Sequence, residues 1–237
     1  MSSPALGARR ARKLLTTNQE ALLTRYTEAV IEASDLLHLT SEKDKPFFRA
    51  RHVNDAVALA QRLPAALLPH QPLQVLDVGT GNGVPGLVLA ILFPEWHVDL
   101  MDSSNKKCLF LDAFIKNNAI KNVSVLCDRA EFLAHKTQRE AYDLVFSRAL
   151  GKLPSALELT IPFLKVDHHL IVSHGTTWQE ELRRSDKALE LLQTQLQQTI
   201  PYTLETYGQF MILIFKKLAP TLERYPRNVG IPTKRPL

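Results

Sequence analysis

The sequence contains little cysteine and no long apolar run. Its 237 residues include two cysteines, Cys108 and Cys127, and their separation matches no metal-ligand spacing. We therefore expect neither a disulfide framework nor a metal site, and the cysteine usage favours a reducing compartment. No apolar stretch of about 18 residues and no signal-peptide core is present, so we expect a cytoplasmic protein without a membrane partner.

Acidic residues are the minority charge. The chain has 24 Asp and Glu against 29 Lys and Arg, a formal net charge of +5. This excess favours a polyanionic partner such as nucleic acid, although proteins that bind no polyanion often share it. Residues 1–17 contain four basic residues and no acid, which predicts a flexible basic tail. An RNA-contacting arm and a targeting segment are the alternatives there.

The hydrophobic content of 45% is enough for one full core. We predict a single domain over residues 18–237, built from a helical extension (18–70), a Rossmann-like core (71–217) and a basic, proline-rich tail (218–237). A second helix of the extension is expected around 51–63, with His52 and Asp55 near its start. That pair favours a local hydrogen bond over a functional site.

The most informative stretch is LQVLDVGTGNGVPG, residues 73–86. A short apolar run ending in a glycine cluster predicts a buried parallel strand followed by a crossover to a helix. Gly79 and Gly81 allow positive φ and close approach of a ligand, and Pro85 suits the first turn of a helix over 87–93. Ligands bind at such strand ends in open α/β sheets.

Two cofactors compete for this loop. GTGNG matches the glycine pattern of S-adenosylmethionine (SAM) sites, and GNGVPG also matches the dinucleotide pattern. Asp77 favours SAM, because a carboxylate opposes a pyrophosphate but suits an ammonium and a sulfonium. A purely structural glycine turn is the third possibility.

Strands and helices alternate after the loop. This alternation predicts an α/β fold with a doubly wound, mostly parallel sheet. The expected strands are 96–101, 123–127, 142–147, 169–173 and 210–217, and the expected helices are 105–118, 131–135, 155–164 and a long one over 178–198.

Polar residues follow several of these strands. Asp102 lies 23 positions after Gly79, near the spacing at which an acid meets ribose hydroxyls, with Asp99 as a competing register. Asp128 to Glu131 open a helix, where the acids suit either the helix N-terminus or an adenine amino group. Arg148 follows the fourth strand, where a ligand carboxylate or phosphate competes with a structural ion pair.

The fourth strand also excludes some chemistry. Neither an amino-methyltransferase tetrapeptide nor a cysteine nucleophile follows it, and both cysteines are expected to be apolar fillers. An acceptor that needs no deprotonation remains, such as N7 of guanine, for which alignment and a suitable field could suffice.

Seven segments resemble the bacterial RsmG (GidB, glucose-inhibited division protein B) methyltransferases. They are HLTSEKD, RHVNDA, LDVGTGNGVPG, LMDSSNKKCLFL, DRAEF, FSRAL and YPRNVGIPTKRPL, spread from about residue 36 to the end. The resemblance implies a class I SAM-dependent methyltransferase that modifies N7 of a guanosine in 16S small-subunit ribosomal RNA, free or in the assembled subunit. The oligomeric state stays open, with a monomer favoured.

The resemblance also implies roles for individual residues. Gly79, Gly81, Val84 and Asp77 would line the methionine and ribose side of SAM. Asp102 would accept hydrogen bonds from the ribose hydroxyls, and Ala130 and Glu131 would lie beside the adenine. Arg148 would be the catalytic residue, at the cofactor edge facing the acceptor, and would also bind the cofactor; it would position either the target nucleotide or the SAM carboxylate. The cations expected to meet RNA are Lys106, Lys107, Lys152, Arg227, Lys234 and Arg235.

This chain departs from the family pattern at a few positions. Asn82 and Ala56 replace a common Pro and Ser, and Gln209 replaces an Arg before the last strand. His174 replaces a Lys after the fifth strand, which weakens the electrostatic case for RNA there. The tail has one acid against four cations, and we expect its four prolines to prevent a helix. A non-catalytic RNA-binding relative and a nicotinamide oxidoreductase are the alternatives.

A cofactor-binding comparison separates the two glycine-loop interpretations. We expect titration calorimetry to detect SAM binding and no binding of NAD, because the two cofactors present opposite charges to Asp77. Tighter binding of NAD than of SAM would reverse the assignment.

Overall fold

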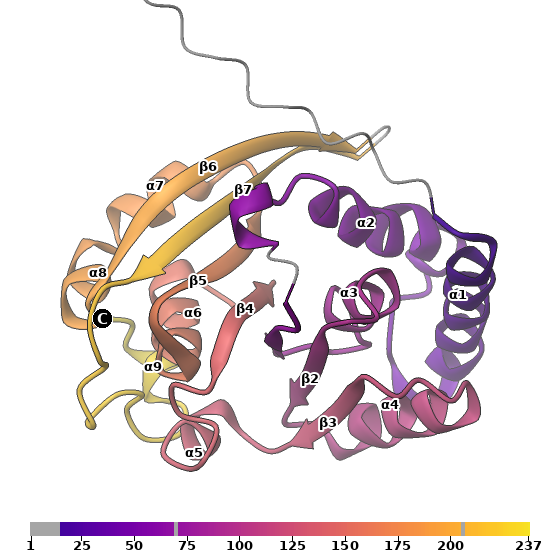
Figure 1. Cartoon of the computed structure of the whole chain (residues 1–237), viewed down its shortest axis with the longest axis horizontal. Helices are drawn as coiled ribbons and strands as arrows, with labels where there is room; N and C mark the ends of the chain where they lie inside the picture. The colour runs from indigo at the N-terminus through magenta and orange to yellow at the C-terminus, as the bar shows by residue number, and fades with distance from the viewer. Residues whose placement is uncertain (1–14, 69–70, 205–206) are drawn as a thin grey trace, which may run out of the picture.

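The computed structural model describes residues 15–68, 71–204 and 207–237, and its centre is one seven-stranded sheet (Figure 1). The strand order is β3-β2-β1-β4-β5-β7-β6, with parallel pairing from β3 through β5 and antiparallel pairing of β7 with both β5 and β6. The strands are β1 (Gln74–Val78), β2 (His97–Asp102), β3 (Val123–Cys127), β4 (Tyr142–Arg148), β5 (Leu164–His174), β6 (Thr194–Leu204) and β7 (Gly208–Lys217). The predicted mostly parallel α/β sheet is confirmed.

Helices cover both faces of the sheet, as Figure 1 shows. One layer contains α1 (Thr17–Leu37), α2 (Asn54–Ala60), α3 (Gly86–Leu92) and α4 (Asn105–Asn117). The other contains α5 (Ala130–Leu133), α6 (Leu153–Thr160), α7 (Trp178–Arg183), α8 (Asp186–Leu191) and α9 (Ile231–Lys234). Each face has its own apolar cluster, so the sheet is buried on both sides, as parallel sheets require. No helix in the described part of the chain is long and apolar enough to cross a membrane.

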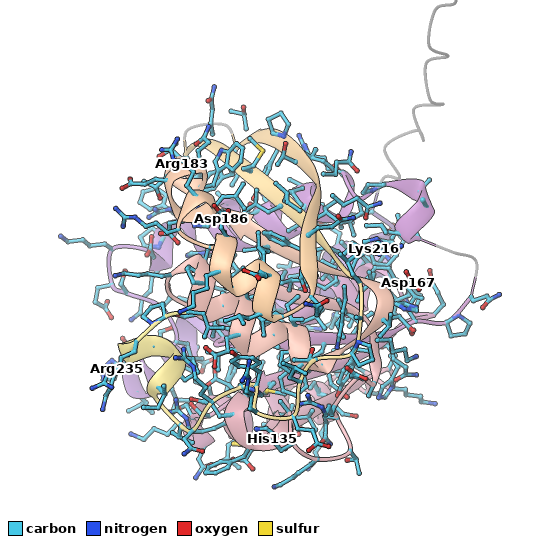
Figure 2. The ribbon with its side chains drawn as sticks, turned by 90° about the vertical axis from the view of Figure 1, so that its left-hand side faces the viewer. His135, Asp167, Arg183, Asp186, Lys216 and Arg235 are labelled. Carbon is cyan, nitrogen blue, oxygen red and sulfur yellow. The ribbon has the colours of Figure 1, made fainter. Side chains whose placement is uncertain are left out.

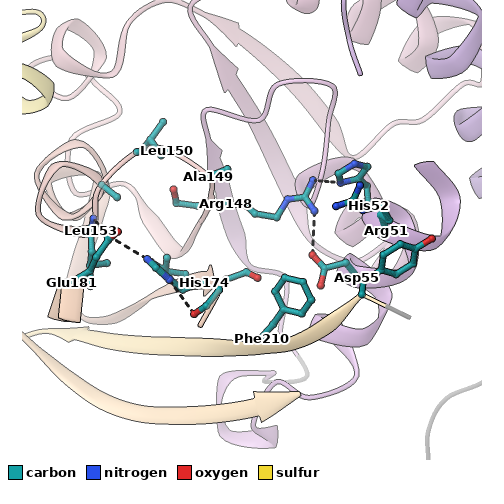
Figure 3. A pocket seen from close by; sticks show the side chains of 17 residues that line it. Arg51, His52, Asp55, Arg148, Ala149, Leu150, Leu153, His174, Glu181 and Phe210 are labelled. Atoms are coloured by element: carbon teal, nitrogen blue, oxygen red, sulfur yellow. Dashed lines mark hydrogen bonds and ion pairs between the residues drawn. The ribbon is translucent and has the colours of Figure 1, made fainter. Parts of the chain in front are cut away.

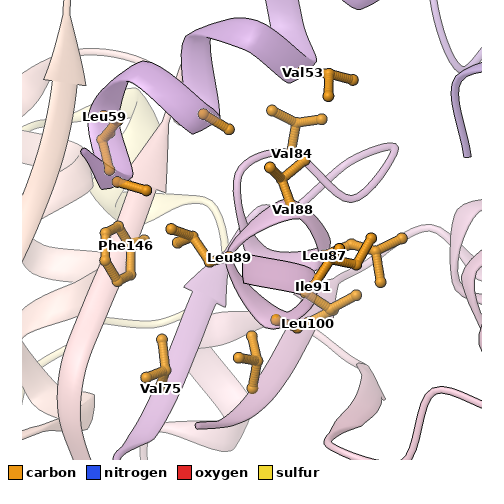
Figure 4. Packing of buried hydrophobic residues seen from close by; sticks show 14 of the residues in the cluster. Val53, Leu59, Val75, Val84, Leu87, Val88, Leu89, Ile91, Leu100 and Phe146 are labelled. Carbon is orange, nitrogen blue, oxygen red and sulfur yellow. The ribbon is translucent and has the colours of Figure 1, made fainter. Parts of the chain in front are cut away.

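The N-terminal extension covers α3, which is almost entirely buried. Val53 and Leu59 of the extension lie in one apolar cluster with Val84 and Leu89 (Figure 4). A helix that is apolar on all sides needs such cover, because it cannot leave one face to water. Without α1 and α2, α3 would expose apolar surface next to the glycine loop.

Helix α1 also holds the glycine loop directly. It begins at a capping box in which Thr16 and Gln19 exchange side-chain and backbone hydrogen bonds. Its Tyr26 hydroxyl donates to Asn82 O at 2.8 Å, and Asn82 Nδ2 donates to Leu39 O at 3.0 Å. Asn82, one of the departures from the family pattern, therefore joins the loop to the extension.

Two sequence predictions near the C-terminus are wrong. The long helix expected over 178–198 is two short helices followed by β6, an edge strand that pairs with β7 along its length. Pairing with an apolar neighbour outweighs local helical preference there, and Pro201 is tolerated because β6 is at the edge. The tail does form one helical turn, α9, since Pro232 stands in its first turn, where no amide is needed.

Gly86 tests how tightly β1 and α3 pack. A Cβ there would lie 2.4 Å from Leu100 Cδ2 and 2.7 Å from Asp77 Cβ, whereas a Cβ on Gly175 would meet nothing within 4 Å. We expect Gly86→Ala to lower the free energy of unfolding by about 1–3 kcal/mol despite alanine's better helix propensity. Urea unfolding measures it, and the control Gly175→Ala should stay within about 0.5 kcal/mol of wild type. Equal losses in both variants would contradict this packing.

Candidate functional site

Two neighbouring cavities open at the carboxyl edge of the sheet. The smaller, of about 200 Å³, lies beside the ends of β1, β2 and β3 and is lined by Gly79, Asp102, Ala130 and Glu131 among others. The larger, of about 430 Å³, lies between β4, β5, β7 and the N-terminal extension (Figure 3). Leu150 lines both cavities and so separates them. This is the edge at which open α/β sheets bind ligands.

The glycine loop uses most of its own amides. Three of the backbone N–H groups donate to backbone carbonyls: those of Gly79 and Thr80 to Met101 O, and that of Gly83 to Thr80 O. Two more donate to carboxylates: Gly81 N–H to Asp102 Oδ2 at 2.9 Å and Gly86 N–H to Asp77 Oδ2 at 2.8 Å. Pro85 has no amide to offer. A pyrophosphate needs several unoccupied N–H groups, so the loop is poorly suited to a dinucleotide.

Asp77 shapes the loop from beneath. Its side chain is 1% exposed, and one carboxylate oxygen accepts both Gly86 N–H and the Thr80 hydroxyl, the latter at 2.7 Å. Burial raises the pKa of Asp77 to about 6, against the lowering effect of these hydrogen bonds. Gly79 (φ +72°) and Gly81 (φ +62°) follow in the left-handed region, where side chains are strained.

Asp102, rather than Asp99, reaches the smaller cavity. Its two carboxylate oxygens accept the N–H groups of Gly81 and Ser104, each at 2.9 Å, which fixes the side chain at the rim. Asp99 instead accepts the Tyr142 hydroxyl at 2.7 Å within the sheet. A fixed carboxylate with remaining lone pairs suits the hydroxyls of a ribose.

Ala130 and Glu131 also line the smaller cavity. Glu131 is 4% exposed and accepts hydrogen bonds from Arg129 and from Gly230 N–H at 3.0 Å. Burial raises the pKa of this carboxyl, but those bonds outweigh burial and lower it overall. Glu131 therefore joins the cavity wall to the C-terminal tail. The acidic lining, the positive-φ glycines and the occupied loop amides together fit SAM better than a dinucleotide.

Val84, a predicted cofactor-binding residue, and the lysines predicted to bind RNA lie in different parts of the structure. Val84 is buried in the apolar cluster above α3 (Figure 4) rather than placed on either cavity wall. Lys106 and Lys152 are exposed, and Lys107 Nζ lies beside Gly81. The predicted basic arm falls largely on residues 1–14, outside the described part of the chain.

The C-terminal tail is fastened to the second helical layer. Arg227 binds Glu158, a fully buried carboxylate, through its backbone N–H, Nε and Nη2 at 2.6–2.8 Å. His135 lies against Pro226 O at 2.9 Å. Lys234 and Arg235 are exposed, and Figure 2 shows Arg235 on the outside of this segment. Of the three tail cations predicted to meet RNA, Arg227 is thus held by the protein itself.

Arg148 is the centre of the larger cavity. Its Nη1 donates to Asp55 Oδ2 and its Nη2 contacts His52 Nδ1, both at 3.1 Å (Figure 3). The Tyr202 hydroxyl donates to the other Asp55 oxygen at 2.7 Å and lies 2.8 Å from Ser173 Oγ. Burial and the adjacent Arg148 charge lower the pKa of His52 to about 4, so this imidazole is neutral at pH 7.

Sequence reasoning missed part of this network. His52 and Asp55 were expected to pair with each other, but each binds Arg148 instead. The role of Tyr202 was not predicted, because its strand β6 begins inside the stretch 178–198, where the sequence predicted a helix. His174 also lines this cavity, with Nε2 at 3.4 Å from Glu181 Oε2, whereas Gln209 is exposed. In the described residues, no group of three or more His, Cys, Asp or Glu side chains is placed to hold a metal.

Comparisons with known proteins agree with this geometry. A family model described as rRNA small subunit methyltransferase G matches residues 19–206. The ribosomal RNA small subunit methyltransferase G of Streptococcus pneumoniae (strain R6) is 34% identical over 224 residues, covering 94% of this chain and 93% of the relative. Its namesake from Thermotoga neapolitana is 41% identical over 172 residues, covering 72% and 75%.

Solved structures with lower identity show the same fold. The 16S rRNA (adenine(1408)-N(1))-methyltransferase from Catenulisporales acidiphilia has a TM-score of 0.52 at 19% identity, covering 67% of this chain and 91% of that one. TYW2 from M. jannaschii, solved in complex with AdoMet, has a TM-score of 0.53 at 17% identity, covering 70% and 76%.

The raised pKa of Asp77 predicts a pH-dependent stability. Because the folded pKa of about 6 lies above the ordinary 3.8, protonation favours the fold; this contribution is complete below pH 3.8 and is lost as the pH rises through 6. We therefore expect the stability of Asp77→Asn relative to wild type to rise by about 1–3 kcal/mol between pH 4 and 8. Urea unfolding across that range measures it, with exposed Asp186→Asn as control. A difference independent of pH would contradict the assignment.

Proposed function

Because the chain belongs to the rRNA small subunit methyltransferase G family, we propose that it transfers a methyl group from SAM to N7 of a guanosine in 16S ribosomal RNA. The observation that carries this proposal is the pair of cavities that share Leu150: one has the features of a SAM site, and the other, of about 430 Å³, is large enough for a base and is lined by His52, Asp55 and Arg148 among others. An RNA base enters such a pocket by leaving its stack.

In this proposal the smaller cavity binds the cofactor. Asp102 accepts the ribose hydroxyls, Gly79 and Gly81 let the cofactor approach the backbone, and Ala130 with Glu131 bounds the adenine. Asp77 contributes mainly by holding the loop, since its bonds are internal. Val84 acts through packing the loop against α3 and the N-terminal extension.

The bound cofactor supplies a methyl group on a sulfonium, and the N7 lone pair forms the new C–N bond as the C–S bond breaks. No proton moves, so no general base is needed. The chain contributes alignment and a suitable field. Arg148 lies on the acceptor side, because it lines the larger cavity and is paired with Asp55, which balances its charge.

We propose that exposed cations guide the RNA to this edge. The exposed ones are Lys106, Lys152, Lys234 and Arg235, and half-buried Lys107 reaches toward Gly81 of the glycine loop. Arg227 serves by anchoring that tail. Residues 18–237 act as one unit, since the extension supplies two partners of Arg148. We further propose action as a monomer in the cytoplasm; naked RNA and the assembled subunit are both candidate substrates.

The direct test is transfer of labelled methyl from SAM to small-subunit RNA and to intact small subunits from a strain lacking this activity. We expect one N7-methylguanosine, mapped by strand cleavage specific for that base, on at least one of the two substrates. Arg148→Ala should lower turnover by at least about tenfold while keeping SAM affinity, because Arg148 does not line the cofactor cavity. SAM binding without transfer to either substrate would overturn the proposal.

A further inference from the structure

The contact with Arg148 determines which nitrogen of the neutral His52 ring carries the proton. A guanidinium has five N–H donors and no acceptor, and Arg148 Nη2 lies 3.1 Å from His52 Nδ1. Nδ1 must therefore accept, which places the proton of the neutral ring on Nε2. The described residues include no hydrogen-bond partner for Nε2, and His52 lines the larger cavity.

Packing keeps this ring in place and uncharged. Phe48, which is fully buried, lies against it with ring centroids 5.2 Å apart. A second proton would have to sit on Nδ1, facing the N–H of Arg148, so the doubly protonated ring is disfavoured by geometry as well as by burial.

The Arg148 charge beside this ring is balanced. One Asp55 oxygen accepts a hydrogen bond from Arg148 and the other accepts one from Tyr202, so the carboxylate is held beside the guanidinium by both of its oxygens. The corner formed by His52, Asp55 and Arg148 therefore has a net charge near zero and offers the cavity N–H donors. A purine methylated at N7 becomes cationic, and an uncompensated cation beside it would oppose the reaction.

Guanine presents two adjacent acceptors on this edge, N7 and O6, whereas adenine presents N7 and an amino donor. The common arginine contact with guanine takes both acceptors, and it would occupy the N7 lone pair that must attack the methyl group. One N–H on each terminal nitrogen of Arg148 is already committed to Asp55 or His52. A single donor placed at O6 identifies guanine and leaves N7 unbonded.

We propose that His52 is the base-recognition residue of the larger cavity, donating from Nε2 to O6 of the acceptor guanine. Arg148 holds the ring through Nδ1, Asp55 is a positioning residue that holds Arg148, and Tyr202 is a positioning residue that holds Asp55. This assignment rests on the proposed function, because it takes the larger cavity as the acceptor site.

Two substitutions of His52 distinguish the acceptor role of Nδ1 from the donor role of Nε2. His52→Asn can keep an acceptor near Nδ1 for Arg148 but loses the distal donor, whereas His52→Gln can keep a distal donor but loses the acceptor. The substrate counterpart is RNA with 2-aminopurine at the target position, which keeps N7 and lacks O6. The same two substitutions at His97, a half-buried histidine of β2 that lines neither cavity, are the controls.

Double-mutant comparison of kcat/KM tests the contact. For wild type, we expect 2-aminopurine to lower kcat/KM by roughly 10–100-fold, the size of one lost base contact. His52→Asn should lose a similar factor on guanine RNA, yet change less than about threefold further on 2-aminopurine RNA. His52→Gln should still discriminate between the two substrates, and SAM affinity should be unchanged in both. If the loss of kcat/KM caused by His52→Asn and the loss caused by 2-aminopurine simply multiply when combined, the proposal is overturned.

A measurement without catalysis keeps this test separate from the proposed function. ¹⁵N NMR of the labelled imidazoles, with His52 assigned by its absence in His52→Asn, should show the Nε2–H tautomer in the protein alone. Guanosine monophosphate should shift the Nε2 signal, and the 2-aminopurine nucleotide should not. An Nδ1–H tautomer, or equal shifts from both nucleotides, would overturn the role of His52 even if methyl transfer to RNA is found. Absent transfer with the expected NMR result would instead contradict the reaction.

Discussion

The structure depends on one buried oxygen atom. Asp77 Oδ2 accepts the first amide of α3 and the Thr80 hydroxyl, and through these two bonds the chain turns from β1 into a helix that is almost entirely buried. Buried amides at a helix start need acceptors, and here the protein provides them itself. The loop therefore has its shape before any cofactor binds, and the N-terminal extension can pack over α3 as a rigid surface.

Arg148 is a second junction, between parts of the chain that are distant in sequence. It ends β4, yet its partners come from the extension, and Tyr202 of β6 completes the arrangement. The outer antiparallel hairpin and the N-terminal helices thus meet at the carboxyl edge of the parallel strands, whose pairing with one another involves neither of them. Their presence makes sense as a frame for the larger cavity.

Sequence reasoning predicted the parts of this arrangement that depend on local pattern. The glycine loop, the apolar strands β1 to β5 and the position of Asp102 follow from spacing and from the rule that parallel strands end at one edge. The partners of Arg148 did not follow, because His52 and Asp55 are separated from it by more than ninety residues. Strand β6 was missed because its first half is mostly Thr and Gln and continues a helical pattern; its apolar alternation begins only at Ile200, and its structure comes from pairing with β7.

The bond between Glu131 and Gly230 links positions 99 residues apart, close to the last residue of the chain. Arg227 and Glu158 reinforce the same closure from the neighbouring helix. The wall of the smaller cavity therefore cannot be complete before residue 230 has folded back onto α5. The pairing of β1 to β4 and the hydrogen bonds of the glycine loop need no residue beyond 148, so a chain growing on the ribosome can form them before this wall exists.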